Sequence, residues 1–157
     1  MRKRRSSVLD LFERLDAVVV RWMSRWGILL LRAALGMIFI WFGGLKIFRV
    51  SPVSDLVAQT VYWVSPKFFV PFLGVWELIV GLGLLFGICL RTVLFLFFLQ
   101  MAGTFLVLVM RPEVAFQGGN PLLLTTVGEF VVKNTVLISA GLVIGSTVRR
   151  SSSKRER

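Results

Sequence analysis

Histidine is absent from the 157-residue sequence, and Cys89 is its one cysteine. Without histidine there is no bis-histidine haem, histidine zinc or copper site, Ser-His-Asp triad or histidine proton shuttle. A single cysteine excludes an internal disulfide, a CxxC dithiol and a cysteine-ligated iron–sulfur cluster. We therefore expect no haem, no iron–sulfur cluster and no metal site such as zinc. Because Cys89 lies in an apolar run, we expect a small buried residue rather than a reactive thiol.

Acidic and charged residues are also scarce. Eight Asp and Glu stand against 19 Lys and Arg, which gives a formal net charge of +11. Charged residues make up 17% of the chain, below the roughly 25% of soluble domains, and hydrophobic residues make up 56%. So much apolar surface excludes disorder and disfavours a soluble globule. The composition predicts a polytopic membrane protein.

Four apolar segments are each long enough to cross a ~30 Å hydrocarbon core as a helix. They cover about residues 27–48, 68–90, 92–110 and 122–146. They predict an all-α fold, in which residues 27–146 form an antiparallel four-transmembrane-helix bundle. Arg91 alone separates the second segment from the third, which predicts a tight helical hairpin. A short helix is expected on the outer membrane surface within residues 51–66.

Proline and glycine punctuate the connections between these segments. Pro66 and Pro71 are expected at helix starts rather than in helix interiors. Gly118, Gly119 and Pro121 predict a turn before the fourth span.

Residues 1–26 combine a basic start, MRKRR, with an amphipathic period. From residue 8 onward apolar side chains recur at three- and four-residue steps, and charged side chains fill the other side. No small-residue cleavage site follows, so the segment is interpreted as a retained signal anchor. We expect an interfacial amphipathic helix, with a docking helix for a partner subunit as the alternative. Residues 147–157 are predicted to be a disordered basic tail.

Basic residues are distributed unequally between the two sides of the predicted bundle. Thirteen of the 19 Lys and Arg lie in residues 1–26, in residues 147–157 and at Arg91. With an even number of spans between them, these three parts of the chain lie on the same side of the membrane. The opposite loops carry Arg49, Lys67 and Arg111. The positive-inside rule therefore places both termini in the cytoplasm. The basic tails are expected to meet anionic lipid there, and no nucleic-acid-binding motif accompanies them.

Ionisable side chains within hydrocarbon cost about 3 kcal/mol each and need a partner or a purpose. On the first span a stripe of charge and glycine falls within about 40°: Arg32, Gly36, Phe39, Gly43 and Lys46. On the second span Glu77 shares its face with Gly74 and Gly81, and glycines allow a neighbouring backbone to approach. Gly36, Gly43, Gly74 and Gly81 are thus the predicted packing glycines.

A candidate polar site follows in the outer half of the bundle. Its predicted members are Lys46, Glu77, Gln100, Glu129 and Lys133, the last two in the favourable i, i+4 order. One interpretation is that these groups only hold the helices together. The other is that they line a polar cavity open to the outside, for a quinone head group, a small anion or a proton path. No catalytic residue follows from the spacing.

Three segments resemble the DoxX-like family of bacterial membrane proteins. LRAALGMIFIWFGGLKIF (31–48) resembles the family's first span, and WELIVGLGLLFGICLRT (76–92) resembles its second. Residues 112–145 resemble its last span, which carries Gly-x-Phe-x-x-Lys-Asn. The likeness covers about residues 28–146. It extends to five motif positions, Arg32, Lys46, Glu77, Gly128 and Lys133.

The resemblance implies a multi-pass protein of the bacterial inner membrane. Some members of the family are subunits of thiosulfate:quinone oxidoreductase or of oxidoreductase complexes linked to oxidative or thiol stress. Three hypotheses follow: an accessory or anchoring subunit of a membrane oxidoreductase, a small proton-coupled transporter or channel, and a structural scaffold. The first is preferred. It implies a protein that is not an enzyme by itself, with quinone as a candidate cofactor, and oxidoreductase subunits or a second copy as candidate partners.

Overall fold

The computed structural model describes the backbone of residues 2–153 and the side chains of Leu9 and residues 11–148. The helices within this range are α1 (Arg2–Ile47), α2 (Ser54–Thr60), α3 (Pro66–Phe86), α4 (Leu90–Met110), α5 (Pro112–Ala115) and α6 (Thr126–Ser153), with a 3₁₀ turn, η1 (Gln117–Gly119). The described backbone has no β-strand, and its one β-bridge joins Phe116 to Leu124. The all-α prediction is confirmed.

Four of these helices are long and apolar enough to cross a membrane. The apolar spans are Leu11–Ile47, Pro66–Phe86, Leu90–Met110 and Thr126–Val148. Large apolar side chains remain on their outer surfaces, as Trp41 (70% exposed) and Val136 (70% exposed) show. Such a surface suits lipid, because helices satisfy their own backbone hydrogen bonds in hydrocarbon. The protein is a polytopic all-α membrane protein, as the composition predicted.

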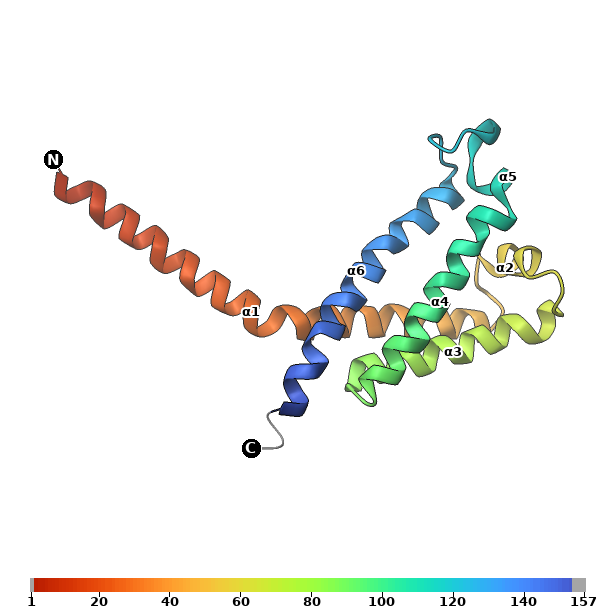
Figure 1. The fold of residues 1–157 in the computed structure, drawn as a ribbon, viewed down its shortest axis with the longest axis horizontal. Coiled ribbons are helices and arrows are strands. Elements are labelled where there is room, and N and C mark those ends of the chain that lie inside the picture. The colour runs from red at the N-terminus through yellow and green to blue at the C-terminus, as the bar shows by residue number, and fades with distance from the viewer. Residues whose placement is uncertain (1, 154–157) are drawn as a thin grey trace.

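α1 joins the predicted amphipathic segment to the first span without an interruption. Figure 1 shows the red first part of α1 extending away from the other helices and the axis changing direction before α1 reaches α3. All described side chains of residues 11–27 are exposed. We call residues 2–26 the N-terminal arm. It is helical, as predicted, and lies outside the bundle.

The C-terminal part of the chain differs from the prediction. Disorder was expected from residue 147, but α6 continues to Ser153. The reason is local: no proline or glycine follows Gly145 to end the helix. The rest of the predicted tail, residues 154–157, lies outside the described residues.

Two pairs of glycines bring α1 and α3 together. A Cβ added to Gly36 would lie 2.8 Å from the carbonyl oxygen of Gly81, and a Cβ added to Gly43 would lie 2.6 Å from that of Gly74. A Cβ added to Gly74 would lie 2.7 Å from the carbonyl oxygen of Gly43, and a Cβ added to Gly81 would lie 2.7 Å from that of Gly36. Both pairs are spaced by seven residues, so the antiparallel helices touch twice along one seam. No side chain fits between these backbones.

The core joins this α1–α3 pair to the α4–α6 pair, which crosses it obliquely in Figure 1. Phe97 of α4 lies at the centre and is fully buried. Its ring centroid lies 5.3 Å from that of Phe39 on α1. Val80 and Leu84 of α3 and Ile144 of α6 belong to the same cluster of buried side chains. Packing of side chains between the two layers thus holds all four spans in one bundle.

The connection between α3 and α4 is the tight hairpin that the sequence predicted. Gly87 ends α3 in the left-handed region (φ 72°), where glycine has no steric cost. Cys89 is also left-handed (φ 46°) and is exposed. The prediction of a buried Cys89 is therefore wrong, because α3 ends at Phe86 and leaves this residue in the turn. The second span is correspondingly shorter than predicted.

The outer connections agree with the sequence except at two points. α2 is the predicted short helix, Pro66 begins α3, and Gly118 and Gly119 turn with φ of 58° and 74°. Pro71, however, lies inside α3 rather than at a helix start. The fourth span begins at Thr126 instead of residue 122, because Leu124 is not helical and forms a β-bridge with Phe116.

Substitution of the seam glycines tests this packing. Gly43→Ala places a methyl group against the Gly74 carbonyl, which cannot move aside, so we expect a loss of about 1–3 kcal/mol and a lower Tm in detergent. Gly44→Ala is the matched control, because nothing lies within 4 Å of its added Cβ. Its Tm should be unchanged or higher, since alanine favours helix by up to ~1 kcal/mol over glycine. Equal Tm values for the two variants would contradict the seam.

Candidate functional site

Three helices each contribute one polar side chain to a buried cluster. Lys46 Nζ of α1 donates hydrogen bonds to both carboxylate oxygens of Glu77 on α3, at 2.8 and 2.7 Å. Gln100 Nε2 of α4 donates to Glu77 Oε1 at 2.5 Å. The side chains of Lys46 and Glu77 are only 7% and 9% exposed. We call Lys46, Glu77 and Gln100 the ionic triad.

The glycine seam positions the ion pair of this triad. Lys46 lies one helical turn after Gly43, and Glu77 lies one turn after Gly74. Since Gly43 and Gly74 touch, the two charged side chains start from adjacent backbones, and a Cβ on Gly43 would lie 3.0 Å from Glu77 Cβ. The ring of Phe42 also lies 6.0 Å from Lys46 Nζ, within cation–π range. The short helix separation thus allows Lys46 to reach both oxygens.

A buried ion pair is stable only when its groups are fully paired, because desolvation of two charges costs several kcal/mol. The Glu77 carboxylate receives three N–H bonds, which meets this condition. One acceptor of the triad differs: Gln100 Oε1 is buried and has no hydrogen-bond partner among the described residues. The triad therefore presents one unused acceptor within the membrane-spanning part.

Glu129 and Lys133 are not part of this cluster. They form their own i, i+4 pair on α6, with Lys133 Nζ 3.2 Å from Glu129 Oε2 and the two side chains 73% and 56% exposed. No described hydrogen bond links them to the triad. The predicted single cluster of five residues is thus two separate groups. Helical phase placed each residue on a face of its own helix, but only the packing decided which faces meet.

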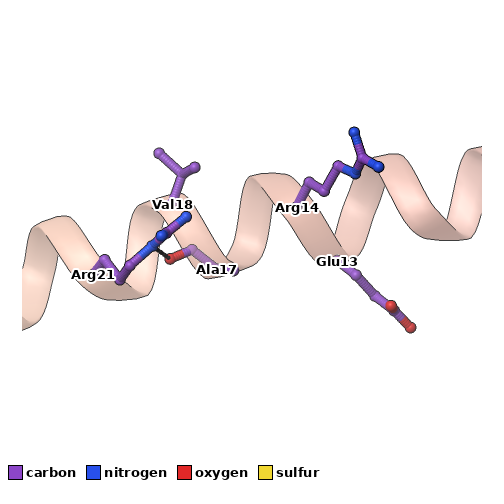
Figure 2. A pocket seen from close by; sticks show the side chains of 5 residues that line it. All are labelled: Glu13, Arg14, Ala17, Val18 and Arg21. Carbon is purple, nitrogen blue, oxygen red and sulfur yellow. Dashed lines mark hydrogen bonds between the residues drawn. The ribbon is translucent and has the colours of Figure 1, made fainter.

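Neither of two hollows on the described surface is lined by triad residues. One lies along the N-terminal arm beside Glu13, Arg14, Ala17, Val18 and Arg21. Figure 2 shows these five side chains on a single helix, with Glu13 and Arg14 pointing to opposite sides. Arg21 Nε donates to the Ala17 carbonyl oxygen at 3.0 Å. Because no second element faces them, this hollow is not an enclosed site.

A polar contact at the outer end of the bundle was not anticipated from the sequence. The guanidinium of Arg111, just after α4, donates to Glu113 of α5 and to Gln59 Oε1 of α2, the latter at 3.1 Å. This contact lowers the pKa of the exposed Glu113 below its ordinary value. Its contribution to stability is therefore present near neutral pH and is lost as pH falls through the lowered pKa. The Arg-x-Glu spacing after a span was the available signal.

Thr125 and Gly128 dock α6 on the same outer end. Thr125 Oγ1 accepts a hydrogen bond from the Gly128 amide at 3.1 Å and so caps the first turn of α6. The hydroxyl donates in turn to the carbonyl oxygen of Val114 in α5, at 2.5 Å. A Cβ at Gly128 would collide with the Ala115 carbonyl. Gly128 is therefore a packing residue for α5.

The donor chemistry of the described side chains is limited. They contain no group of three or more His, Cys, Asp or Glu close enough to hold a metal ion. The fold and the triad instead define a class: a multi-pass membrane protein whose helices share a buried ion pair. Within that class the DoxX family model matches residues 27–110, more than half of the chain. The protein belongs to the DoxX family.

The matched region covers the first three of the four spans. Residues 27–110 contain the spanning half of α1 and all of α3 and α4, and hence the four seam glycines and the ionic triad. Glu129, Lys133 and the N-terminal arm lie outside it. No curated protein and no solved structure matches the chain significantly.

Removal of one partner tests the ion pair. Lys46→Met leaves the Glu77 carboxylate buried without a counter-charge, and we expect a loss of about 3–5 kcal/mol in the free energy of unfolding. The double variant Lys46→Met/Glu77→Leu carries neither charge and should recover most of this loss. Lys133→Met is the matched control, because its exposed pair contributes less than about 1 kcal/mol. Denaturant titration in detergent measures all three.

A loss no larger in Lys46→Met than in Lys133→Met would show that the triad charge is not buried in the folded protein. A double variant as unstable as Lys46→Met would show that shape, rather than the unpaired charge, causes the loss.

Proposed function

We propose that the protein is an accessory or anchoring subunit of a quinone-linked oxidoreductase in the bacterial inner membrane. Its own part would be to hold the complex in the bilayer and to present the ionic triad at the level of the quinone pool. Membership of the DoxX family supports the membrane role. The lack of histidine and the single, exposed Cys89 mean that electrons would pass through a partner or a bound quinone.

The observation that carries the proposal is the unused acceptor of the triad. Gln100 Oε1 is buried and has no hydrogen-bond partner in the part of the chain that the structure describes, whereas the amide nitrogen of Gln100 donates to Glu77. A buried acceptor without a donor is costly, so a ligand that brings a hydroxyl hydrogen would be stabilised here. A quinol has two such hydroxyls. The free acceptor therefore matches the donor chemistry of a quinol head group, which Gln100 would hold beside the charges of Lys46 and Glu77 once the side chains that cover Oε1 move aside.

A bound quinol would supply two electrons and two protons to the complex. The chain's own side chains would bind and orient the head group through Gln100 Oε1. The apolar rings around the core, including the fully buried Phe97, would exclude water from it. Lys46 and Glu77 would remain a neutral pair, so that the site adds no net charge to the bilayer interior.

The orientation of the protein follows from its basic residues. The N-terminal arm, Arg91 in the α3–α4 hairpin and the end of α6 lie on one side of the bundle, and we propose that this side faces the cytoplasm. The apolar face of the arm, with Phe12 65% and Trp22 58% exposed, is free to rest on the membrane surface. It would also serve as the docking surface for the catalytic partner.

Affinity purification from native membranes in a mild detergent tests the subunit role. We expect a redox enzyme to co-purify in a fixed stoichiometry, identified by mass spectrometry. The arm offers a second comparison: a variant in which Phe12 and Trp22 are changed to serine should lose the partner but keep the bundle. A clean homo-oligomer in both preparations would overturn the subunit role, and proton flux into proteoliposomes would then favour the transporter hypothesis.

Gln100→Leu tests the quinol contact separately. This change keeps the size of the side chain but removes the acceptor, together with the Nε2 donor to Glu77. We expect the Michaelis constant of the complex for quinol to rise roughly tenfold. Thr104→Val is the matched control one turn along α4, because its hydroxyl donates only to the Gln100 backbone carbonyl, at 3.1 Å. An intact complex with the same Michaelis constant in both variants would exclude the quinol contact and leave the subunit role standing.

A further inference from the structure

A second hollow lies between α4 and α6, at the end of the bundle where α4 begins. It measures about 640 Å³ and is lined by Arg91, Leu94, Phe95, Phe98, Gly145 and Val148. None of these residues belongs to the ionic triad or to the α1–α3 seam. It is open to the lipid-facing surface between the two helices, so a membrane component reaches it without a conformational change.

The walls of this groove are apolar. Leu94, Phe95 and Phe98 follow Arg91 along α4, and the groove extends over about 10 Å at 1.5 Å per residue. On α6 the missing side chain of Gly145 leaves the space open, since a Cβ there would meet only Leu94 Cδ1, at 3.5 Å. One turn deeper the groove closes, because Gly141 packs against Phe97, with 2.6 Å from an added Cβ to Phe97 Cε1. The groove thus spans most of the ~15 Å thickness of one membrane leaflet.

One end of the groove is positive, and no described side chain acts as its counter-ion. Arg91 is exposed and makes no hydrogen bond or ion pair with the residues that the structure describes. The guanidinium of Arg32 lies against the adjacent turn, 3.1 Å from a Cβ built on Gly87, and its Nε is buried with no hydrogen-bond partner among the described residues. The sequence between Glu77 and Glu113 contains no acidic residue, nor does that between Glu129 and Glu156.

A positive end joined to an apolar trough is complementary to one class of molecule. An anionic phospholipid has a phosphate at one end and acyl chains that run along the helices. A bidentate guanidinium–phosphate pair is among the strongest hydrogen-bonded contacts. A helix of a partner or of a second copy would fill the groove, but it would pair with Arg91 only if it brought an acidic side chain to this one position. The charge therefore favours a lipid.

We propose that the α4–α6 groove binds one anionic phospholipid, with its phosphate on Arg91 and one acyl chain along Leu94, Phe95 and Phe98. The site is independent of the quinol contact, because the two lie on different helix faces. It would tie α4 to α6 at the end of the bundle from which the N-terminal arm also extends.

Native mass spectrometry of the full chain tests this site. The protein is reconstituted into vesicles with equal amounts of phosphatidylglycerol and phosphatidylcholine and then extracted in a mild detergent. We expect one retained phosphatidylglycerol in the wild type. Arg91→Gln should lower its occupancy roughly fivefold, the effect of one basic side chain near an anionic headgroup. Arg91→Lys should retain most of it.

Two further variants separate charge from shape. Gly145→Leu fills the trough without a change of charge and should also lose the lipid. Gly103→Leu is its control on α4, because nothing lies within 4 Å of an added Cβ there. Lys67→Gln removes a charge at the opposite side of the bundle and should leave the lipid in place.

Equal retention of the two lipids by the wild type would overturn the proposal, since the groove would then hold any surrounding lipid. Unchanged phosphatidylglycerol occupancy in Arg91→Gln would also overturn it. So would a wild-type dimer that carries no lipid and that is lost in Gly145→Leu, because a second copy would then fill the groove. Inorganic phosphate is the last probe. If millimolar phosphate bound while no phosphatidylglycerol was retained, the groove would be a free-anion site and the lipid assignment would be wrong.

Discussion

The close contact between α1 and α3 is the constraint on which the rest of this structure depends. Gly43 and Gly74 let the two backbones touch. Lys46 lies one turn from this contact along α1 and Glu77 lies one turn from it in the opposite direction along α3, and their side chains meet at hydrogen-bond distance. With larger residues at the seam, the helices would separate and two charges would be left in an apolar surrounding. The glycines are therefore as much a part of the polar site as its charges.

The triad combines a packing role with the binding role that we propose for it. Glu77 accepts three N–H hydrogen bonds, and these bonds connect α1, α3 and α4. Only Gln100 Oε1 is left over. Under our proposal, the two interpretations of intramembrane polar residues, helix association and ligand binding, would apply to different atoms of the same cluster. The matched DoxX region contains all of these atoms, which supports a role shared by the family fold.

Two other surfaces carry the remaining contacts that we propose. The N-terminal arm extends from the bundle with an apolar face that no other described element covers. The groove between α4 and α6 lies toward the same end, near Arg91. Both combine positive charge with apolar area, which is the chemistry of an anionic membrane surface. Contacts with lipid and with a partner subunit would thus gather at this end, while the triad lies inside the bundle.

The sequence alone determined the membrane class, the four spans, the seam glycines and the Lys46 and Glu77 faces, because these depend on composition and on the fixed 100° phase of a helix. It could not determine which faces meet. Glu129 and Lys133 share one face of α6, as Glu77 shares a face of α3 with its glycines. The packing of the two helix pairs nevertheless leaves Glu129 and Lys133 outside the triad. Cys89 was placed in a helix because apolar runs do not mark where a turn begins. Only the tertiary structure decided these points, since packing between helices sets which side chains become neighbours.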